Sequence, residues 1–252
     1  VRELKLPAAD NQEEAKPERR SQLLSAGFSP DGNYLVAIDF WPGDKRIILW
    51  DLRQEQAEGR QVGAVTRIPL TSSAFSPDSR LLAWAAGHKT VVLWNLAEAR
   101  VEQEMRLELE PTGPLAFSPD GRQLAALCTP LELKDEADAN DWQGFNSFLV
   151  FWDLVGGREV SRVEAGKVMS LAPLAFSPDG QRLAVGDMTG LLHVFDLTGQ
   201  SSRVVLDHQA MVQQLAFEHT GRRLISGSTG TLKAWEFAED SPTRSQALDA
   251  NL

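Results

Sequence analysis

Four histidines and one cysteine are the side chains best suited to metal binding or nucleophilic chemistry in this sequence. They are His88, His193, His208, His219 and Cys128. No two histidines have the short spacing that a zinc site uses, and Cys128 has no second thiol for a metal or a disulfide. A Gly-x-Ser-x-Gly elbow, a phosphate loop and a dinucleotide fingerprint are also missing from the sequence. We therefore predict that the chain is not an enzyme and has no catalytic residue, metal or cofactor.

A second group of chemically active residues lies in the segment TPLELKDEADANDWQGFNS, residues 129–147. Its carboxylates could bind Ca²⁺, but the Asp-x-Asp-x-Asp-Gly order of a calcium loop is absent. The segment also carries Trp142 and Phe145 in a stretch otherwise poor in apolar side chains. Long loops of this kind are usually functional or disordered. Three interpretations stay open: a loop that contacts a partner, a tolerated surface insertion, or a loop that seals a central channel.

Aromatic and basic side chains also gather in the segment DFWPGDKR, residues 39–46, and a histidine stands in the shorter AAGHKT, residues 85–90. Trp and Arg are enriched at binding hot spots, where Trp buries a large area at a low cost in entropy. The alternative for Trp41 is that it packs against a neighbouring structural unit. The predicted partner-binding residues are Phe40, Trp41, Lys45, Arg46, His88, Asp141, Trp142 and Phe145.

These segments lie within a repeat that must position them. The string FSPDG, or a variant of it, recurs with its Phe at positions 28, 75, 117, 176 and 217. Pro presets the second position of a turn, Ser and Asp bond nearby amides, and Gly accepts a positive φ, so the string predicts a hairpin turn. Each copy is followed by short apolar runs such as IILWDL or VVLWNL. Each unit is therefore predicted to be four antiparallel strands, of which the fourth is the most polar.

Five such units in tandem are typical of a β-propeller, so the predicted fold class is all-β. The pairing of FSPDG with a strand that ends in WDL or WNL resembles the WD40 repeat, in the degenerate style of bacterial members, over nearly the whole chain. The resemblance implies structural roles for the third-strand Trp and Asp, and a buried hydrogen-bonded set in the last unit, where Thr229 takes the usual Asp position. The residues with these implied roles are Trp50, Asp51, Trp94, Trp152, Asp153, His208, Ser226 and Trp235.

The domain organisation follows from the repeat. We expect a single propeller domain or fragment whose repeats span residues 23–70, 71–111, 112–168, 169–210 and 211–252, after a stray strand and a polar link in residues 1–22. Seven blades would need roughly 300 residues, so the five units form either a closed five-bladed ring or, as we favour, part of a larger propeller. The opening VRELKLP would complete the last blade in the ring and would belong to a preceding blade in the arc. The segment after Phe237 has a weak capacity to form a fourth strand.

Charge narrows the range of partners. The chain has 35 acidic and 25 basic side chains and a net charge of −10, so phosphate backbones and anionic lipid should repel it. We predict no nucleic-acid and no membrane partner, and a protein partner with a basic surface opposite the acidic residues of 129–147. A single cysteine fits a cytoplasmic location.

The function that the resemblance implies is a non-catalytic protein–protein interaction scaffold that presents propeller loops to a partner. Two alternatives stay open. One is a sensor or regulatory propeller appended to a larger bacterial enzyme such as a kinase or protease. The other is a ligand-binding or metal-dependent enzymatic propeller, whose ligands would come from several blades around the channel.

Overall fold

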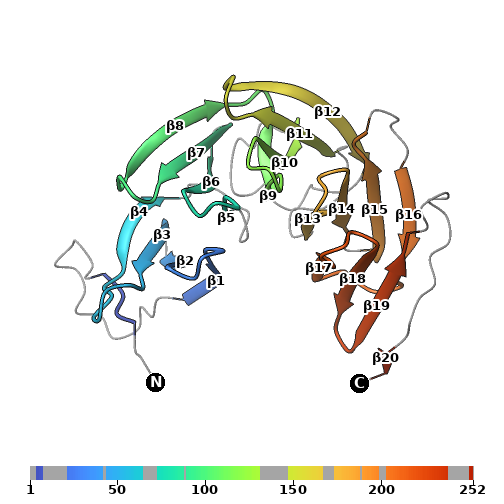
Figure 1. Cartoon of the computed structure of the whole chain (residues 1–252), viewed down its shortest axis with the longest axis horizontal. Coiled ribbons are helices and arrows are strands. Elements are labelled where there is room, and N and C mark those ends of the chain that lie inside the picture. Colours follow the sequence, from blue (N-terminus) through green and yellow to red (C-terminus); the bar gives the residue numbers. More distant parts are fainter. Residues whose placement is uncertain are drawn as a thin grey trace. The chain divides into compact units, whose positions relative to one another are not determined.

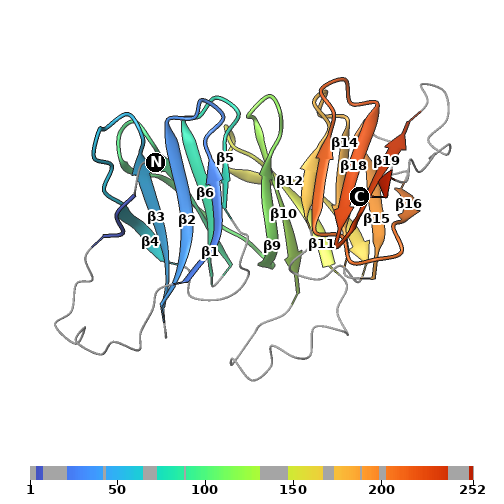
Figure 2. The ribbon, with the colours of Figure 1, turned by 90° about the horizontal axis from the view of Figure 1, so that it is seen from below.

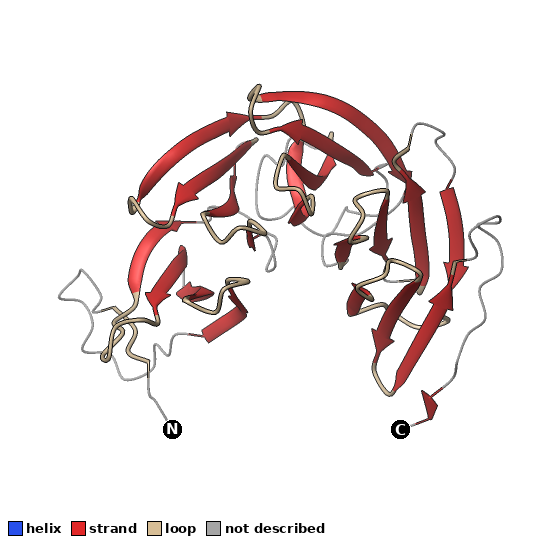
Figure 3. Cartoon of the chain, viewed as in Figure 1, coloured by secondary structure: helices blue, strands red, loops and turns tan. Residues whose placement is uncertain are grey.

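The computed structural model of the chain consists of strands joined by turns and loops (Figure 3). It describes residues 4–7, 22–41, 44–64, 73–87, 89–130, 147–166, 173–187, 189–198, 203–237 and 250–251. Within these ranges, twenty strands form five four-stranded antiparallel sheets, and no helix is present. The predicted all-β class and the five four-stranded units are confirmed.

The chain divides into two compact units, and each is described here by itself. The first unit, Val1–Glu108, holds two sheets, which we call blades 1 and 2 (Figure 1). Blade 1 consists of β1 (Gln22–Phe28), β2 (Tyr34–Trp41), β3 (Asp44–Asp51) and β4 (Arg60–Ala64). Blade 2 consists of β5 (Ser73–Phe75), β6 (Leu81–Gly87), β7 (Thr90–Asn95) and β8 (Arg100–Arg106).

The second unit, Leu109–Leu252, holds blades 3, 4 and 5. Blade 3 consists of β9 (Glu110–Phe117), β10 (Gln123–Thr129), β11 (Ser147–Asp153) and β12 (Arg158–Gly166). Blade 4 consists of β13 (Leu174–Phe176), β14 (Arg182–Gly186), β15 (Leu191–Asp196) and β16 (Arg203–Asp207). Blade 5 consists of β17 (Gln214–Phe217), β18 (Arg223–Ser228), β19 (Thr231–Glu236) and β20 (Ala250–Asn251). In Figure 2 the first turns of blades 3, 4 and 5 lie at the top of the view. The end of β10 and the start of β11 lie at the bottom.

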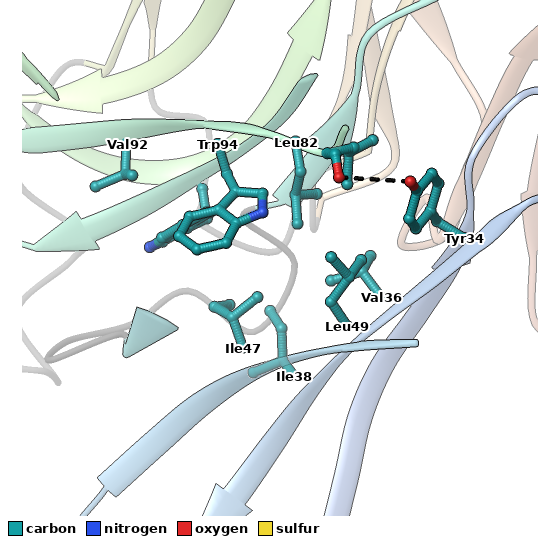
Figure 4. Close-up of a cluster of buried hydrophobic side chains, with 10 residues drawn as sticks. Tyr34, Val36, Ile38, Ile47, Leu49, Leu82, Val92 and Trp94 are labelled. Atoms are coloured by element: carbon teal, nitrogen blue, oxygen red, sulfur yellow. Dashed lines mark hydrogen bonds between the residues drawn. The ribbon is translucent and has the colours of Figure 1, made fainter. Parts of the chain in front are cut away.

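The central strands of blades 1 to 4 are buried on both faces, which explains why they are apolar runs and not alternating patterns. In blade 5, Ile225 and Leu232 of the central strands are exposed. On one face of blade 1, Val36 and Leu49 pack against Leu82 and Trp94 of blade 2 (Figure 4). The side chains that alternate with them form a second cluster around Trp50 on the other face. Each fully buried Leu or Ile side chain contributes roughly 1.5–3 kcal/mol, so these two central strands hold the blade together.

The second unit repeats this packing between its neighbouring blades. Phe151 of blade 3 packs in one cluster with Leu183 and Phe195 of blade 4. Leu192 of blade 4 packs in another cluster with Trp235 of blade 5. Blade 4 therefore contributes apolar side chains to two clusters, one with each neighbour.

Cys128 lies on β10 and is fully buried. Burial is the largest influence on this thiol and raises its pKa far above the ordinary range. The side chain is therefore neutral at physiological pH and is shielded from reagents in the folded chain.

The FSPDG strings form the predicted tight turns. In blade 1, the Ser29 hydroxyl donates to Asp31 Oδ1 at 2.6 Å and accepts from the Tyr34 amide at 2.9 Å. The Gly32 amide donates to the Ser29 carbonyl at 2.9 Å, with φ of Gly32 at 71°. The same Ser–Asp bond recurs in blades 2, 3 and 4. In blade 5 the pair is replaced by Thr220, whose hydroxyl donates to Glu218.

Each end of the chain has a described segment that contacts a blade: residues around Lys5 contact blade 1, and residues 250–251 belong to blade 5. The Lys5 carbonyl accepts hydrogen bonds from Trp50 Nε1 and from the Gly59 amide, both at 2.9 Å, and Lys5 forms a parallel bridge with Glu58. The fourth strand of the last blade is β20, whose two residues pair with β19. The segment after Phe237 therefore forms that strand, which is short. The choice between a closed ring and part of a larger propeller stays a prediction.

Candidate functional site

A β-hairpin in blade 1 carries the first group of predicted partner-binding residues. Strands β2 and β3 pair Phe40 with Lys45 and Trp41 with Asp44, so only two residues connect the strands beyond Trp41. Phe40 and Trp41 thus lie at the end of the hairpin; their backbone is described, whereas their side chains lie outside the description. Lys45 is half-buried.

A buried ion pair lies directly before this hairpin end. Arg46 donates from Nη2 to Asp39 Oδ2 at 2.6 Å and from Nε to the same oxygen at 3.2 Å. The Asp39 side chain is fully buried and that of Arg46 is 12% exposed. Because a buried carboxylate without a cation is costly, the pair fixes the register of the two strands at this point. A partner would reach Arg46 only through its small exposed part.

Asp39 does not stand out from the sequence as a functional residue. Its signal is an acidic side chain inside the apolar strand YLVAIDFW, with an arginine seven residues later. Those two positions become cross-strand neighbours only when the hairpin register is known. The other predicted partner-binding residues lie outside the described residues: His88, Asp141, Trp142 and Phe145.

The third-strand tryptophans are buried side chains of the sheets. Their exposed fractions are 2% for Trp50, 7% for Trp94, 3% for Trp152 and 4% for Trp235. The carboxylates that follow two of them begin the next turn. Asp51 accepts from the Arg53 guanidinium at 2.6 Å, the bond that most lowers the pKa of this carboxyl. Asp153 accepts from the Gly156 amide at 2.9 Å.

In blade 5 the structure brings together a buried polar set of three side chains. Ser226 Oγ lies 2.8 Å from His208 Nδ1 and accepts a hydrogen bond from Trp235 Nε1, also at 2.8 Å. Burial is the main cause that lowers the pKa of His208, and the positive charge of Lys233 lowers it further. Thr229 does not join the set among the described contacts; it accepts from Gln213 Nε2 at 3.3 Å. The set therefore has no carboxylate within the part of the chain that is described.

Blade 4 contains a buried carboxylate that no sequence motif marks, that of Asp187. Asp187 Oδ1 accepts from the amides of Thr189 and Leu191 at 2.9 and 2.8 Å, and from the Thr189 hydroxyl at 2.7 Å. Its Oδ2 lies 3.3 Å from His193 Nε2, and both side chains are 5% exposed. These bonds hold the turn between β14 and β15 and place His193 in a structural contact.

Neither a metal cluster nor a membrane-spanning helix is found in the described part of the chain. No three His, Cys, Asp or Glu side chains among these residues lie close enough together to hold a metal ion. No helix there has the length and apolar character needed to cross a bilayer.

Comparison with known proteins finds a family model that matches three segments of the chain. The family model described as "WD domain, G-beta repeat" matches residues 63–95, 159–196 and 199–236. Each match ends at the residue that follows a third-strand aromatic side chain: Trp94, Phe195 or Trp235.

Several curated proteins are similar to this chain over much of its length. "Transcription factor unc-37" of Caenorhabditis elegans is 24% identical over 228 residues, which are 75% of this chain and 36% of that protein. "Transcriptional corepressor LEUNIG_HOMOLOG" of Arabidopsis thaliana is 23% identical over 222 residues, or 86% of this chain and 25% of that protein. "WD repeat and SOCS box-containing protein 1" of Danio rerio is 28% identical over 195 residues, or 74% of this chain and 41% of that protein. The chain thus spans less than half of the length of each of these relatives.

Proposed function

Starting from a chain that carries WD40 repeats, we propose that it is a non-catalytic scaffold whose blades present their loops to a partner protein. Proteins with such repeats act as protein-interaction scaffolds. The observation that carries the proposal is the buried Asp39–Arg46 ion pair, 2.6 Å between Nη2 and Oδ2, next to Phe40 and Trp41. A charged pair in this position stiffens the hairpin, so an aromatic anchor at its end would bind with little loss of entropy.

The proposed contact surface consists of aromatic anchors with a polar rim. Trp is a frequent hot-spot residue because it buries a large area, whereas the surrounding polar side chains mainly exclude water and set specificity. The anchors are Phe40, Trp41, Trp142 and Phe145, and the rim residues are Lys45, Arg46, His88 and Asp141.

The class of partner follows from charge and from the relatives. A net charge of −10 favours a protein with a basic surface over nucleic acid or anionic lipid. Two relatives are called a transcription factor and a transcriptional corepressor, which supports a partner among proteins that regulate transcription. A cytoplasmic location belongs to the same proposal and rests on the single cysteine.

The test replaces the two tryptophan anchors. The Trp41→Ala/Trp142→Ala double variant should bind a partner that the unmodified chain retains at least about thirtyfold more weakly, since one hot-spot residue alone contributes about 2 kcal/mol. Binding would be measured by calorimetry with the purified partner, and folding by circular dichroism. Val155→Ala is the matched control, because Val155 is 87% exposed and lies in the turn between β11 and β12, far from the hairpin in sequence. A folded double variant that keeps every interaction intact would refute the scaffold surface.

A further inference from the structure

A pocket lies between the first turns of blades 3 and 4, outside the surface proposed above. Its volume is about 460 Å³. The carboxylates of Asp120 and Asp179, one from each turn, line it together with the apolar side chains of Phe176 and Leu197. Gln123, the first residue of β10, also lines the pocket. The pocket thus combines negative charge with an apolar wall.

The corresponding gap between blades 4 and 5 has the same construction. In each gap a turn proline meets a turn glycine of the next blade: a Cβ on Gly180 would lie 3.7 Å from Pro119 Cδ, and one on Gly221 would lie 3.6 Å from Pro178 Cδ. Leu197 and Phe237 also occupy equivalent positions, directly after the acidic residue that ends the third strand. The amide of Leu197 donates to the Gln181 carbonyl, and the amide of Phe237 donates to the Arg222 carbonyl. The two gaps can therefore be compared residue by residue.

The gap between blades 4 and 5 is occupied by an arginine of the chain itself. Arg182, the first residue of β14, stands in blade 4 where Gln123 stands in blade 3. Its Nη1 donates to the Gly221 carbonyl at 3.4 Å, and its guanidinium carbon lies 5.2 Å from the centre of the Phe237 ring. A guanidinium over an aromatic ring is a favourable contact, so this gap shows which side chain the construction accepts.

The first unit fills its gap in a different way. There the same position is Tyr34, whose hydroxyl donates to the carbonyl of Leu96 in blade 2 at 3.4 Å (Figure 4). The Ser79 hydroxyl also accepts from the amide of Asp31 across the two turns, at 3.0 Å. A long side chain at this position thus reaches the next blade in two gaps, whereas the shorter, neutral Gln123 leaves the pocket open.

The charge of the pocket favours a cation. The Ser118 hydroxyl and the Arg122 amide donate to Asp120 and lower the pKa of its carboxyl. Burial raises the pKa of Asp179, but hydrogen bonds from the Ser177 hydroxyl and the Gln181 amide outweigh it, so the pKa is lowered. Both carboxylates therefore stay charged at neutral pH. The positive charges of Arg122 and Arg182 lower the two pKa values further, Arg122 from an exposed position and Arg182 while its Nη1 donates to the Gly221 carbonyl in the next gap.

We propose that the pocket between blades 3 and 4 binds an arginine side chain of a partner protein, in the way that Arg182 occupies the neighbouring gap. The guanidinium would lie between Asp120 and Asp179, with its methylene groups against Phe176 and Leu197. Arginine suits this place better than lysine because its planar group can bond two carboxylates at once. The inference rests on the proposed function, since it takes the ligand to be a protein.

The experiment titrates the whole chain with N-acetyl-arginine N-methylamide and follows the backbone amide NMR signals of Gly121, Gly180 and Gln123. We expect saturable shifts at these signals, and binding at least about tenfold weaker for the neutral citrulline analogue, which lacks the charge-assisted bonds. Gln123→Arg should abolish binding, because the chain would then fill the pocket from within. No saturable shift, equal binding of citrulline, or wild-type binding by Gln123→Arg would each overturn the proposal.

A second variant keeps the test decisive if Gln123→Arg does not fold. Asp120→Asn/Asp179→Asn retains the shape of both turns and should bind the arginine amide about tenfold more weakly. Asp78→Asn, the same change in the equivalent turn of blade 2, is the matched control and should leave binding unchanged. Because the probe reports on the pocket directly, its failure leaves the Trp41 and Trp142 test untouched. Equally, loss of partner binding in the Trp41→Ala/Trp142→Ala variant would leave the result of the probe titration unchanged.

Discussion

Blades 4 and 5 carry different residues at the same place, directly after the glycine that follows the apolar part of the second strand. In blade 4 this residue is Asp187, whose carboxylate accepts three hydrogen bonds and contacts His193. In blade 5 it is Ser228, whose buried hydroxyl has no partner among the described residues. His208 Nε2, also in blade 5, is a second buried atom without a described partner. Equivalent positions of the two sheets thus hold a polar group whose hydrogen bonds are satisfied in blade 4 and one that lacks a described hydrogen-bond partner in blade 5.

The comparison separates the two roles of a buried polar group. A satisfied group holds its neighbours in place, and its removal leaves their donors without acceptors. Burial of an unsatisfied group carries a desolvation penalty that no hydrogen bond offsets. Its removal should therefore lower the free energy of unfolding little or not at all. Blade 4 should therefore be sensitive to loss of the Asp187 carboxylate, whereas blade 5 should tolerate loss of the Ser228 hydroxyl.

The largest effect is expected for Asp187→Ala. The variant removes a buried carboxylate and leaves the amides of Thr189 and Leu191 without an acceptor, and we expect the free energy of unfolding to fall by about 2–4 kcal/mol. Urea unfolding followed by circular dichroism measures it. Asp196→Ala is the matched control, since this carboxylate also accepts from a nearby amide and hydroxyl but in a more exposed turn, and it should cost less than about 1 kcal/mol. Equal losses in the two variants would contradict the comparison.

A smaller effect is expected from pH, through His208. The fold lowers the pKa of His208, so the unfolded chain binds its proton more tightly than the folded chain. Stability from this group is complete above the unfolded pKa of about 6.5 and is lost as the pH falls below it, by at most about 1.4 kcal/mol down to pH of about 5.5. Urea unfolding at several pH values measures the loss. His208→Gln should remove it; a loss of the same size in that variant would assign it to another group.

The smallest effect is expected for Ser228→Ala. Because the Ser228 hydroxyl is buried without a described partner, its removal should change the free energy of unfolding by less than about 1 kcal/mol, in the stabilising direction if at all. Ser226→Ala sharpens the contrast, since this hydroxyl bonds both His208 and Trp235 and its loss should cost about 1–3 kcal/mol. Thermal melts of the two variants give the order. Destabilisation by Ser228→Ala as large as that by Ser226→Ala would point to a partner for Ser228.

The repeat made the fold predictable because each FSPDG turn specifies its own geometry. Ser29 and Asp31 bond within a few residues of each other, so their contacts depend on local sequence alone. In blade 2, the apolar runs that follow are buried on both faces, as their composition indicates.

The polar pairs were not predictable in this way, because they join positions that only a register brings together. Asp39 and Arg46 are cross-strand neighbours in a hairpin of known pairing, and an acidic residue inside an apolar strand does not by itself indicate its partner. The pocket depends on a comparison across blades: Gln123 is an ordinary strand residue until it is set beside Tyr34 and Arg182. The predicted anchors Trp41 and Trp142 stay predictions, since their side chains lie outside the described residues.

The complete burial of Cys128 has a practical consequence. It is the single cysteine of the chain and lies in a central strand of blade 3. Its thiol can react with a soluble maleimide or disulfide reagent only after β10 has separated from its neighbours. The rate at which Cys128 is labelled therefore reports how often this blade opens. The chain allows this measurement without an engineered cysteine.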